Sequence, residues 1–240
     1  MTRIITEKYR CANCNNELAR HQAASSSSFF DGDNIFECKH TFTGLFPKLY
    51  CCPSCGYIGE DLSKEPDQKI KEIIDSGDYQ LFMKIGDKYN PYFQHFLLAY
   101  TLMKLGKYKE AIIHYICAIS YSCTLFLIES PIYDLLDQRD IDLDIIADNT
   151  NNPGHLFIND LIVDCTKHID YQKEDSFLLF HASIDALRRR RELEEAIRLI
   201  NIALTKNFSS LEKSLLKQEQ ELCSKEDILT IIKVIEEEEI

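Results

Sequence analysis

The chain has 240 residues, a formal net charge of −12 at pH 7 and a hydrophobic content of 45%. This composition is ordinary for a globular protein with a real core, and the length suits a small domain followed by a larger one. The negative charge argues against a protein that wraps nucleic acid or an anionic membrane by electrostatic attraction.

The N-terminal quarter of the chain differs from the rest. It contains six of the ten cysteines, a serine run at 25–28 and a balanced set of charges. The N-terminus has no apolar stretch of signal-peptide length, and the longest apolar runs are too short to span a membrane. We therefore expect a cytoplasmic protein with no membrane partner. In that reducing compartment cysteines are more often metal ligands than disulfides. Short β-prone pieces at 34–38 and 49–51 predict a small module of loops and strands over residues 1–62.

Two cysteine pairs give this module its strongest chemical signal. The first pair is Cys11 and Cys14, and the second is Cys52 and Cys55, which is followed by Gly56. In a CxxC turn the second thiolate folds back beside the first, and a glycine after the pair suits a positive φ. Two such pairs supply the four thiolates of a closed, tetrahedral zinc site. The sequence therefore predicts one structural Zn²⁺ held by these four cysteines.

Some alternatives to this ligand set and metal stay open. Cys38, His40 and Cys51 lie between or beside the two pairs, and any of them is a substitute ligand. The CPxCG form of the second pair also resembles rubredoxin, whose ion is iron, and thiolate geometry alone does not separate iron from zinc. A reducing-compartment dithiol is a further alternative, which two CxxC pairs fit poorly. Because the module has few large apolar residues, metal binding is expected to supply much of its folding free energy.

Helix signals recur from residue 63 to residue 240. Asn90 and Ser130 each precede a proline, which places an N-cap residue before the first helical position, and Ser209 begins a capping box. Short connections favour antiparallel neighbours, so a mainly α domain is expected here. The signals predict helices at 67–75, 79–88, 91–105, 108–122, 131–138, 155–169, 174–190, 193–206, 210–222 and 225–237.

Two segments of the helical region share a finer pattern. Ala111 and Ala118 follow Gly106 in the first segment, and Ala196 and Ala203 hold the matching positions in the second. Alanines seven residues apart lie two turns apart on one helix face, where a small side chain lets another helix approach closely. Both segments resemble tetratricopeptide (TPR) repeats. The copies are 85 residues apart, which is not a multiple of the usual period of about 34, so the helices between them are expected to be divergent or unrelated. An ordinary helical bundle is the alternative.

The cysteine pairs and the two helical segments together resemble a known grouping. The chain is similar to uncharacterised bacterial proteins in which a zinc-ribbon-like CxxC…CPxCGY module precedes TPR-like helices, and here that motif runs from Cys52 to Tyr57. The resemblance implies a mainly α protein with a zinc-ribbon-like Cys₄ module at 1–62 and a helical TPR-like repeat domain at 63–240. It implies no settled activity. Loss of the metal is expected to unfold the small module and leave the helical part folded.

Other patterns in the sequence are weaker. The acidic stretch at 140–144 begins like a calcium loop but lacks the glycine and glutamate that such a loop needs. Cys165 and His168 lie one helical turn apart without a third ligand nearby, which favours packing over metal binding. The four arginines at 188–191 are followed directly by glutamates, and a helix C-terminus that favours cations accounts for them.

No nucleotide-binding, hydrolase, metalloprotease or kinase motif is found, so we expect a protein that is not an enzyme. The leading hypothesis is an adaptor or scaffold that binds a protein partner through its TPR-like helices, with zinc in a structural role. One alternative is a rubredoxin-like iron redox module. The other is a nucleic-acid-binding zinc-ribbon protein, disfavoured by net charge, whose basic face would be built from Arg3, Lys8, Arg10, Arg20 and the arginines at 188–191.

Overall fold

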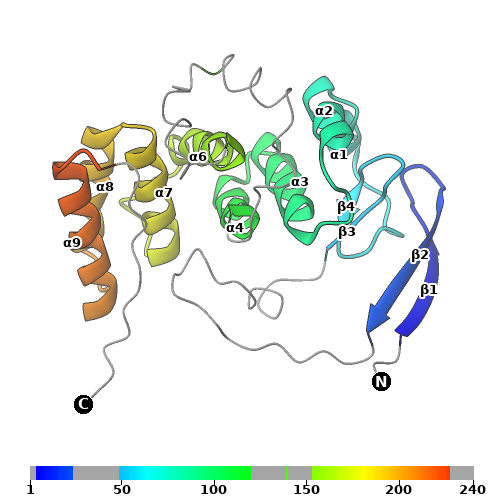
Figure 1. Cartoon of the computed structure of the whole chain (residues 1–240), viewed down its shortest axis with the longest axis horizontal. Coiled ribbons are helices and arrows are strands. Elements are labelled where there is room, and N and C mark those ends of the chain that lie inside the picture. The colour runs from blue at the N-terminus through cyan, green and yellow to red at the C-terminus, as the bar shows by residue number, and fades with distance from the viewer. Residues whose placement is uncertain (1–3, 24–48, 120–138, 140–152, 228–240) are drawn as a thin grey trace.

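The protein is mainly helical, with short strands and a cysteine cluster near its N-terminus (Figure 1). The computed structural model describes residues 4–23, 49–119, 139 and 153–227. Eight helices and four strands lie within these ranges. Every helix in them is too short or too polar to cross a membrane.

The strands form two separate antiparallel hairpins. Strand β1 (Ile4–Arg10) pairs with β2 (Glu17–Ala23), and β3 (Tyr50–Cys51) pairs with the equally short β4 (Ile58–Gly59). The hairpins belong to different sheets, so the β-structure does not form a continuous layer. Each hairpin therefore acts as a support for the loop at its end.

The strand predictions are confirmed in part. The β-prone piece at 49–51 is confirmed as β3, whereas the piece at 34–38 lies outside the described residues. The long first hairpin was not predicted, because its strands carry charged residues among few β-branched ones. An ion pair of 2.8 Å between exposed Arg10 and Glu17 faces across the hairpin beside its loop.

The helices follow in chain order, and most predicted ranges agree with them to within three residues. The structure has helices α1 Gln68–Ile74, α2 Gly77–Ile85, α3 Pro91–Lys104, α4 Tyr108–Ile119, α6 Pro153–Thr166, α7 Phe177–Arg189, α8 Leu193–Leu204 and α9 Ser210–Ser224. The predicted helix at 131–138 lies outside the described ranges. Of the one predicted at 225–237, residues 225–227 are not helical and the remainder is not described.

Local hydrogen bonds explain where these helices begin. The side chains of Ser76 and Asn90 accept from backbone N–H groups at the starts of α2 and α3, as N-cap residues do. Ser209 forms the predicted capping box at the start of α9, with both reciprocal hydrogen bonds present. Helix α7 begins at Phe177 because Ser176 is its cap, three residues later than the sequence suggested.

Three described helix ends share one left-handed turn, at Glu226 after α9 and at two positions that lie 85 residues apart. Gly106 after α3 has a φ of 76°, and Arg191 after α7 has a φ of 59°. Beyond each of them a backbone N–H reaches back to a helix carbonyl at 2.9 Å, from Lys107 in the first case and from Glu192 in the second. This is the Schellman arrangement, in which glycine is the favoured residue. The same geometry at matching positions is consistent with the internal similarity seen in the sequence.

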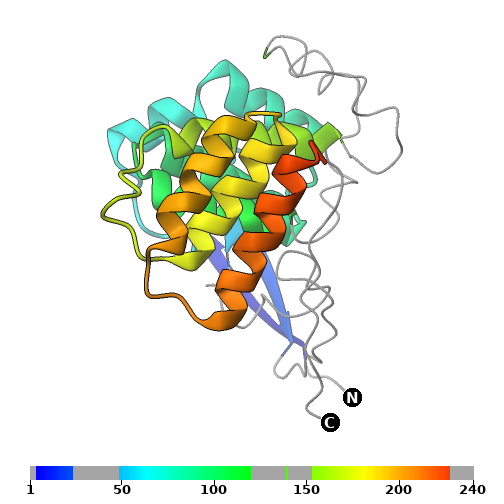
Figure 2. The ribbon, with the colours of Figure 1, turned by 90° about the vertical axis from the view of Figure 1, so that its left-hand side faces the viewer.

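The helices pack as a row in which chain neighbours are also spatial neighbours. Helices α3, α4, α6, α7, α8 and α9 each contact the next helix in this order. Figure 1 shows the row from α2, next to the strands, to α9 at the far end, and Figure 2 looks onto the end formed by α7, α8 and α9. Ala111, Ala118, Ala196 and Ala203 are fully buried, as the helix-face argument requires.

One hydrophobic cluster runs through the whole row. It begins at Cys11 in the first hairpin and extends to Cys223 in α9, so it includes residues on both sides of the predicted boundary after residue 62. The strands are therefore packed onto the helical row.

Candidate metal centre

The two cysteine pairs lie in the loops of the two hairpins. Cys11 and Cys14 belong to the loop between β1 and β2, and Cys52 and Cys55 belong to the loop between β3 and β4. A hairpin fixes the two ends of its loop, so each CxxC turn is held in a defined geometry by the strand pairing below it. The sequence predicted the turns and a strand at 49–51, and the structure adds the first hairpin and β4 as further supports.

The two loops repeat the same backbone pattern at an offset of 41 residues. Cys11 N–H donates to the Asn16 carbonyl at 3.0 Å, and Cys52 N–H donates to the Tyr57 carbonyl at 2.8 Å. The residue after each pair has a positive φ, which is 80° at Gly56 and 60° at Asn15. The positive φ at Gly56 was expected from the sequence. The equivalent role of Asn15 was missed, although asparagine is one of the few side chains that tolerate this conformation.

The four sulfurs converge from the two loops. The Sγ atoms of Cys11 and Cys55 are 3.7 Å apart, and those of Cys14 and Cys52 are 3.6 Å apart. All four lie within 4.8 Å of one another, and all four thiols are free. A tetrahedral ion with metal–sulfur bonds of about 2.3 Å holds its sulfurs about 3.8 Å apart. Both of these short contacts cross from one loop to the other, as expected when a single ion joins both.

The surroundings of the thiols also favour a cation. Burial raises the pKa of the Cys11 and Cys55 thiols, and the backbone N–H groups of Cys14 and Asn13 oppose that rise at Cys11. At Cys14 burial is slight, and the backbone N–H of Asn16 with the neighbouring thiols holds the pKa below its ordinary value. Buried thiols stay protonated unless a positive charge is added. A divalent ion supplies that charge and lets all four sulfurs bind as thiolates.

The substitute ligands considered from the sequence have different outcomes. Cys51 is buried beside the site, but its Sγ faces the backbone carbonyls of Cys52 and Gly56 and is not among the four clustered sulfurs. Burial raises the pKa of its thiol to about 12, so Cys51 behaves as a small apolar residue. Cys38 and His40 lie outside the described residues. The four cysteines thus form a candidate metal site, and four thiolates suit both zinc and iron.

Polar side chains close the site from both loops. The Asn16 side-chain amide donates to the Ser54 hydroxyl at 2.6 Å, which joins the first loop directly to the second. A side-chain hydrogen bond from Asn13 acts on Cys55 across the site and favours its thiolate form. These asparagines were not singled out from the sequence. Their signal was present, because both lie inside or next to the first CxxC turn.

Cys165 and His168, the thiol and imidazole that the sequence places one helical turn apart, do not form a metal site. Cys165 is fully buried in α6, whereas His168 is exposed and stacks on Tyr108 with ring centroids 4.3 Å apart. Within the described ranges, the four clustered cysteines are the one group of three or more potential metal ligands. The acidic stretch at 140–144 is not described.

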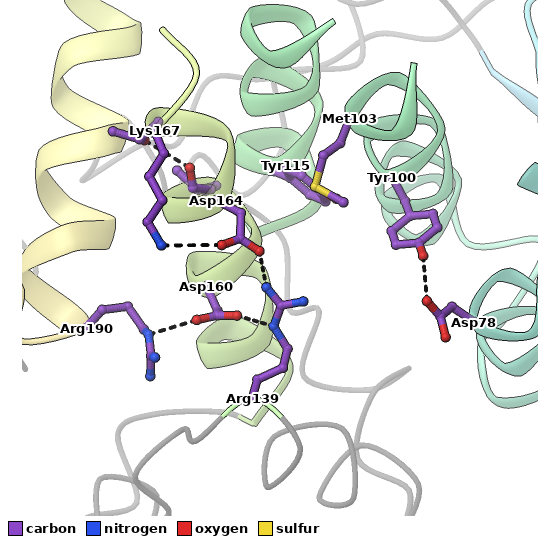
Figure 3. Close-up of polar contacts among 11 residues, drawn as sticks. Asp78, Tyr100, Met103, Tyr115, Arg139, Asp160, Asp164, Lys167 and Arg190 are labelled. Carbon is purple, nitrogen blue, oxygen red and sulfur yellow. Dashed lines mark hydrogen bonds and ion pairs between the residues drawn. The ribbon is translucent and has the colours of Figure 1, made fainter. Parts of the chain in front are cut away.

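Three of the four arginines at 188–191 form ion pairs with acidic residues of the helices. Arg188 has no exposed surface and pairs with Glu219 at 2.8 Å. Arg190 pairs with Asp160 of α6 at 3.0 Å, and Figure 3 shows Asp160 between Arg190 and Arg139. Arg188 and Arg189 lie in the last turn of α7, as expected of cations at a helix C-terminus, and Arg188 is also fully buried. No local pattern in the sequence indicated that Glu219 of α9 pairs with Arg188 or that Asp160 of α6 pairs with Arg190.

No protein-family model, curated protein or solved structure matches the chain. The class that fold and site together define is a mainly helical protein with a four-cysteine candidate metal site near its N-terminus.

Proposed function

We propose that the chain is a non-enzymatic adaptor that binds a protein segment along its TPR-like helices and carries one structural Zn²⁺. The zinc is held by Cys11, Cys14, Cys52 and Cys55 and does not exchange ligands during function. The resemblance to bacterial proteins that combine a zinc ribbon with TPR-like helices supports the same architecture.

The convergence of the four sulfurs is the observation that carries the metal part of the proposal. Spacings of 3.6 and 3.7 Å across the two loops suit a closed tetrahedral site. A closed site leaves no open position for a substrate or water, which favours a structural role over a catalytic one. Zinc is preferred to iron because the fused row of helices suits a binding protein better than a free-standing electron carrier.

The sequential packing of α3 to α9 supports the adaptor part. In repeat proteins each unit contacts mainly its neighbours, and the resulting extended surface binds a segment of another protein. The left-handed turns at Gly106 and Arg191 hold matching positions in the two segments, which fits two related helix pairs, and the same turn also ends α9 at Glu226. The net charge of −12 favours a neutral or basic partner segment.

Binding of nucleic acid has less support. Three of the four arginines in the 188–191 run, those at 188–190, pair with acidic groups of α6, α7 and α9. Arg10 also pairs with Glu17 across the first hairpin. Cations neutralised in this way contribute little to phosphate binding.

Peptide display tests the adaptor proposal. The zinc-loaded chain is used to select from a random peptide library, and binding of the enriched peptides is compared with that of two charge-reversal variants. We expect a shared, non-acidic consensus whose binding weakens in Glu110→Lys on the exposed surface of α4. The matched control Glu17→Lys lies on the hairpin and should bind normally. Selection without a consensus, or equal binding by all three proteins, would contradict the proposal.

A further inference from the structure

The second cysteine loop is attached to the first helices of the row by a buried hydrogen bond. The hydroxyl of Tyr79 in α2 donates to the backbone carbonyl of Gly56 at 2.7 Å. Gly56 directly follows Cys55, one of the four sulfur residues. Tyr79 has no exposed surface. The Gly56 carbonyl, in the second cysteine loop (the metal loop, between β3 and β4), is therefore hydrogen-bonded to a buried residue of the helical part of the chain.

Packing at Gly56 leaves no room between the loop and α2. A Cβ atom at this position would lie 2.8 Å from the Met83 sulfur and 2.9 Å from a ring carbon of Tyr79. Gly56 also has a φ of 80°, which its loop requires. The same glycine thus shapes the CxxC turn and seats it on the helix.

Two further contacts tie the loops to the start of the helical part. Lys88, which follows α2, donates from Nζ to the Pro53 carbonyl at 3.1 Å. Ala12 in the first loop donates its backbone N–H to the Leu62 carbonyl at 2.8 Å, just before α1. Both cysteine loops are therefore connected to the helices.

The surface beneath the metal loop is strongly apolar. Tyr79 and Phe82 of α2 and Phe93 of α3 are almost fully buried. Phe82 makes edge-to-face contacts with Phe96 and Tyr100 of α3, with ring centroids 4.9 and 5.0 Å apart. A row of packed helices needs a cover for the apolar face at each end, because the terminal unit has a neighbour on one side only.

We propose that the metal-bound second loop is the N-terminal cap of the helical row, and that Tyr79 couples occupancy of the metal site to the folding of α2 and α3. The inference rests on the metal binding proposed above. It differs from the expectation that loss of metal leaves all helices folded. Removal of the ion is now expected to loosen the helices that the loop covers, and α8 and α9 at the other end should stay folded.

Hydrogen exchange on the full-length chain tests the cap. The protein is compared as loaded with Zn²⁺ and after removal of Zn²⁺ by a chelator, with metal content measured in both samples. The cap predicts at least a tenfold increase in the exchange rate of amides in α2 and α3 after removal. Amides of α8 should change by less than twofold.

A pair of conservative variants tests the role of Tyr79. Tyr79→Phe removes the hydroxyl that bonds to Gly56 and keeps the ring, whereas Tyr115→Phe removes a hydroxyl from an equally buried tyrosine of α4 whose contact is a distant sulfur at 3.8 Å. Release of Zn²⁺ to a coloured chelator should be about fivefold faster in Tyr79→Phe, the factor expected for one hydrogen bond. Tyr115→Phe should release zinc at the wild-type rate.

The outcomes separate this inference from the proposed function. A chain that binds no Zn²⁺ would overturn both. A chain that binds Zn²⁺ but shows unchanged exchange in α2 and α3 after its removal would overturn the cap alone. Equal acceleration in α2 and α8 would also overturn the cap, because it would indicate global unfolding. Equal zinc release by the two variants would overturn the role of Tyr79.

Discussion

Arg188 of α7 and Glu219 of α9 form an ion pair of 2.8 Å in which neither side chain has exposed surface. The guanidinium also donates to Asp185 and to the backbone carbonyl of Asp227, both at 2.6 Å. A buried arginine is tolerated only when its charge is balanced and its donors are used. The pair therefore fixes how α9 packs on α7 at the far end of the row.

Removal of this arginine should destabilise the protein strongly. Arg188→Met leaves Glu219 buried without its charged partner, and we expect the free energy of unfolding to fall by about 3–5 kcal/mol. Urea unfolding followed by circular dichroism measures the change. The matched control is Arg198→Met, whose pairing with Glu195 is largely exposed and should contribute less than about 1 kcal/mol.

A second substitution separates loss of the charge pair from loss of packing. Arg188→Met combined with Glu219→Leu removes both charges, so much of the lost stability should return. A double variant that is as unstable as the sum of its single variants would show that the pair is not coupled in this way.

Gly56 and Gly106 offer a comparison between two positive-φ glycines. Alanine at either position strains the backbone, but only at Gly56 does the new methyl group collide with Met83 and Tyr79. We expect Gly106→Ala to lower stability by about 1 kcal/mol and Gly56→Ala by about 2–4 kcal/mol, with weaker zinc retention in Gly56→Ala only. Thermal unfolding and zinc analysis of both variants check this, and equal losses would argue against tight packing of the metal loop on α2.

Arg191 offers a stabilising substitution. It occupies the left-handed position after α7, where the equivalent position after α3 is Gly106. Arg191→Gly relieves the strain that a Cβ atom causes in this conformation, so the unfolding free energy should rise by about 0.5–1 kcal/mol. Arg191→Ala keeps the Cβ atom and should show no such gain. A loss of stability in the glycine variant would indicate that contacts of the Arg191 side chain outweigh the strain.

His155 in α6 gives a pH-dependent prediction. Burial lowers its pKa from 6.5 to about 4, with the charge of Arg189 acting in the same direction. Its Nε2 atom has no hydrogen-bond partner among the residues that the structure describes. Between pH 6.5 and 4 the unfolded chain therefore binds more protons at this site than the folded chain does. The contribution of neutral, buried His155 to the free energy of unfolding is therefore complete above pH 6.5 and is lost as the pH falls toward 4.

The size of this effect can be measured by difference. From pH 6.5 to 5 the wild-type protein should lose about 1–2 kcal/mol more stability than His155→Leu, which cannot titrate at this position. Parallel profiles for wild type and His155→Leu would show that burial of His155 does not control its protonation.

Local signals in the sequence predicted much of the fold. The CxxC turns, the positive φ at Gly56 and the caps at Asn90 and Ser209 all depend on residues within a few positions of each other. The burial of the four alanines in α4 and α8 followed from helical periodicity in the same way. These features need no knowledge of distant parts of the chain.

The remaining features depend on contacts between distant residues. Burial of Arg188 depends on Glu219, which lies 31 positions away on another helix, so the sequence indicated only that the basic run lies at a helix C-terminus. The bond from Tyr79 to Gly56 joins a helix to a metal loop 23 positions earlier. Neither partner is marked by a local pattern. Within the candidate metal site, the four clustered cysteines were predicted, whereas the asparagines around them were not.

X-ray absorption at the metal edge, together with metal quantification on protein prepared without added metal, tests the central claim most directly. We predict one zinc ion per chain surrounded by four sulfurs at about 2.3 Å. Cys14→Ser should lose the ion or replace one sulfur by a lighter atom, and Cys51→Ser should keep all four sulfurs. A chain without bound metal, or a first shell containing nitrogen in the wild-type protein, would contradict the assignment.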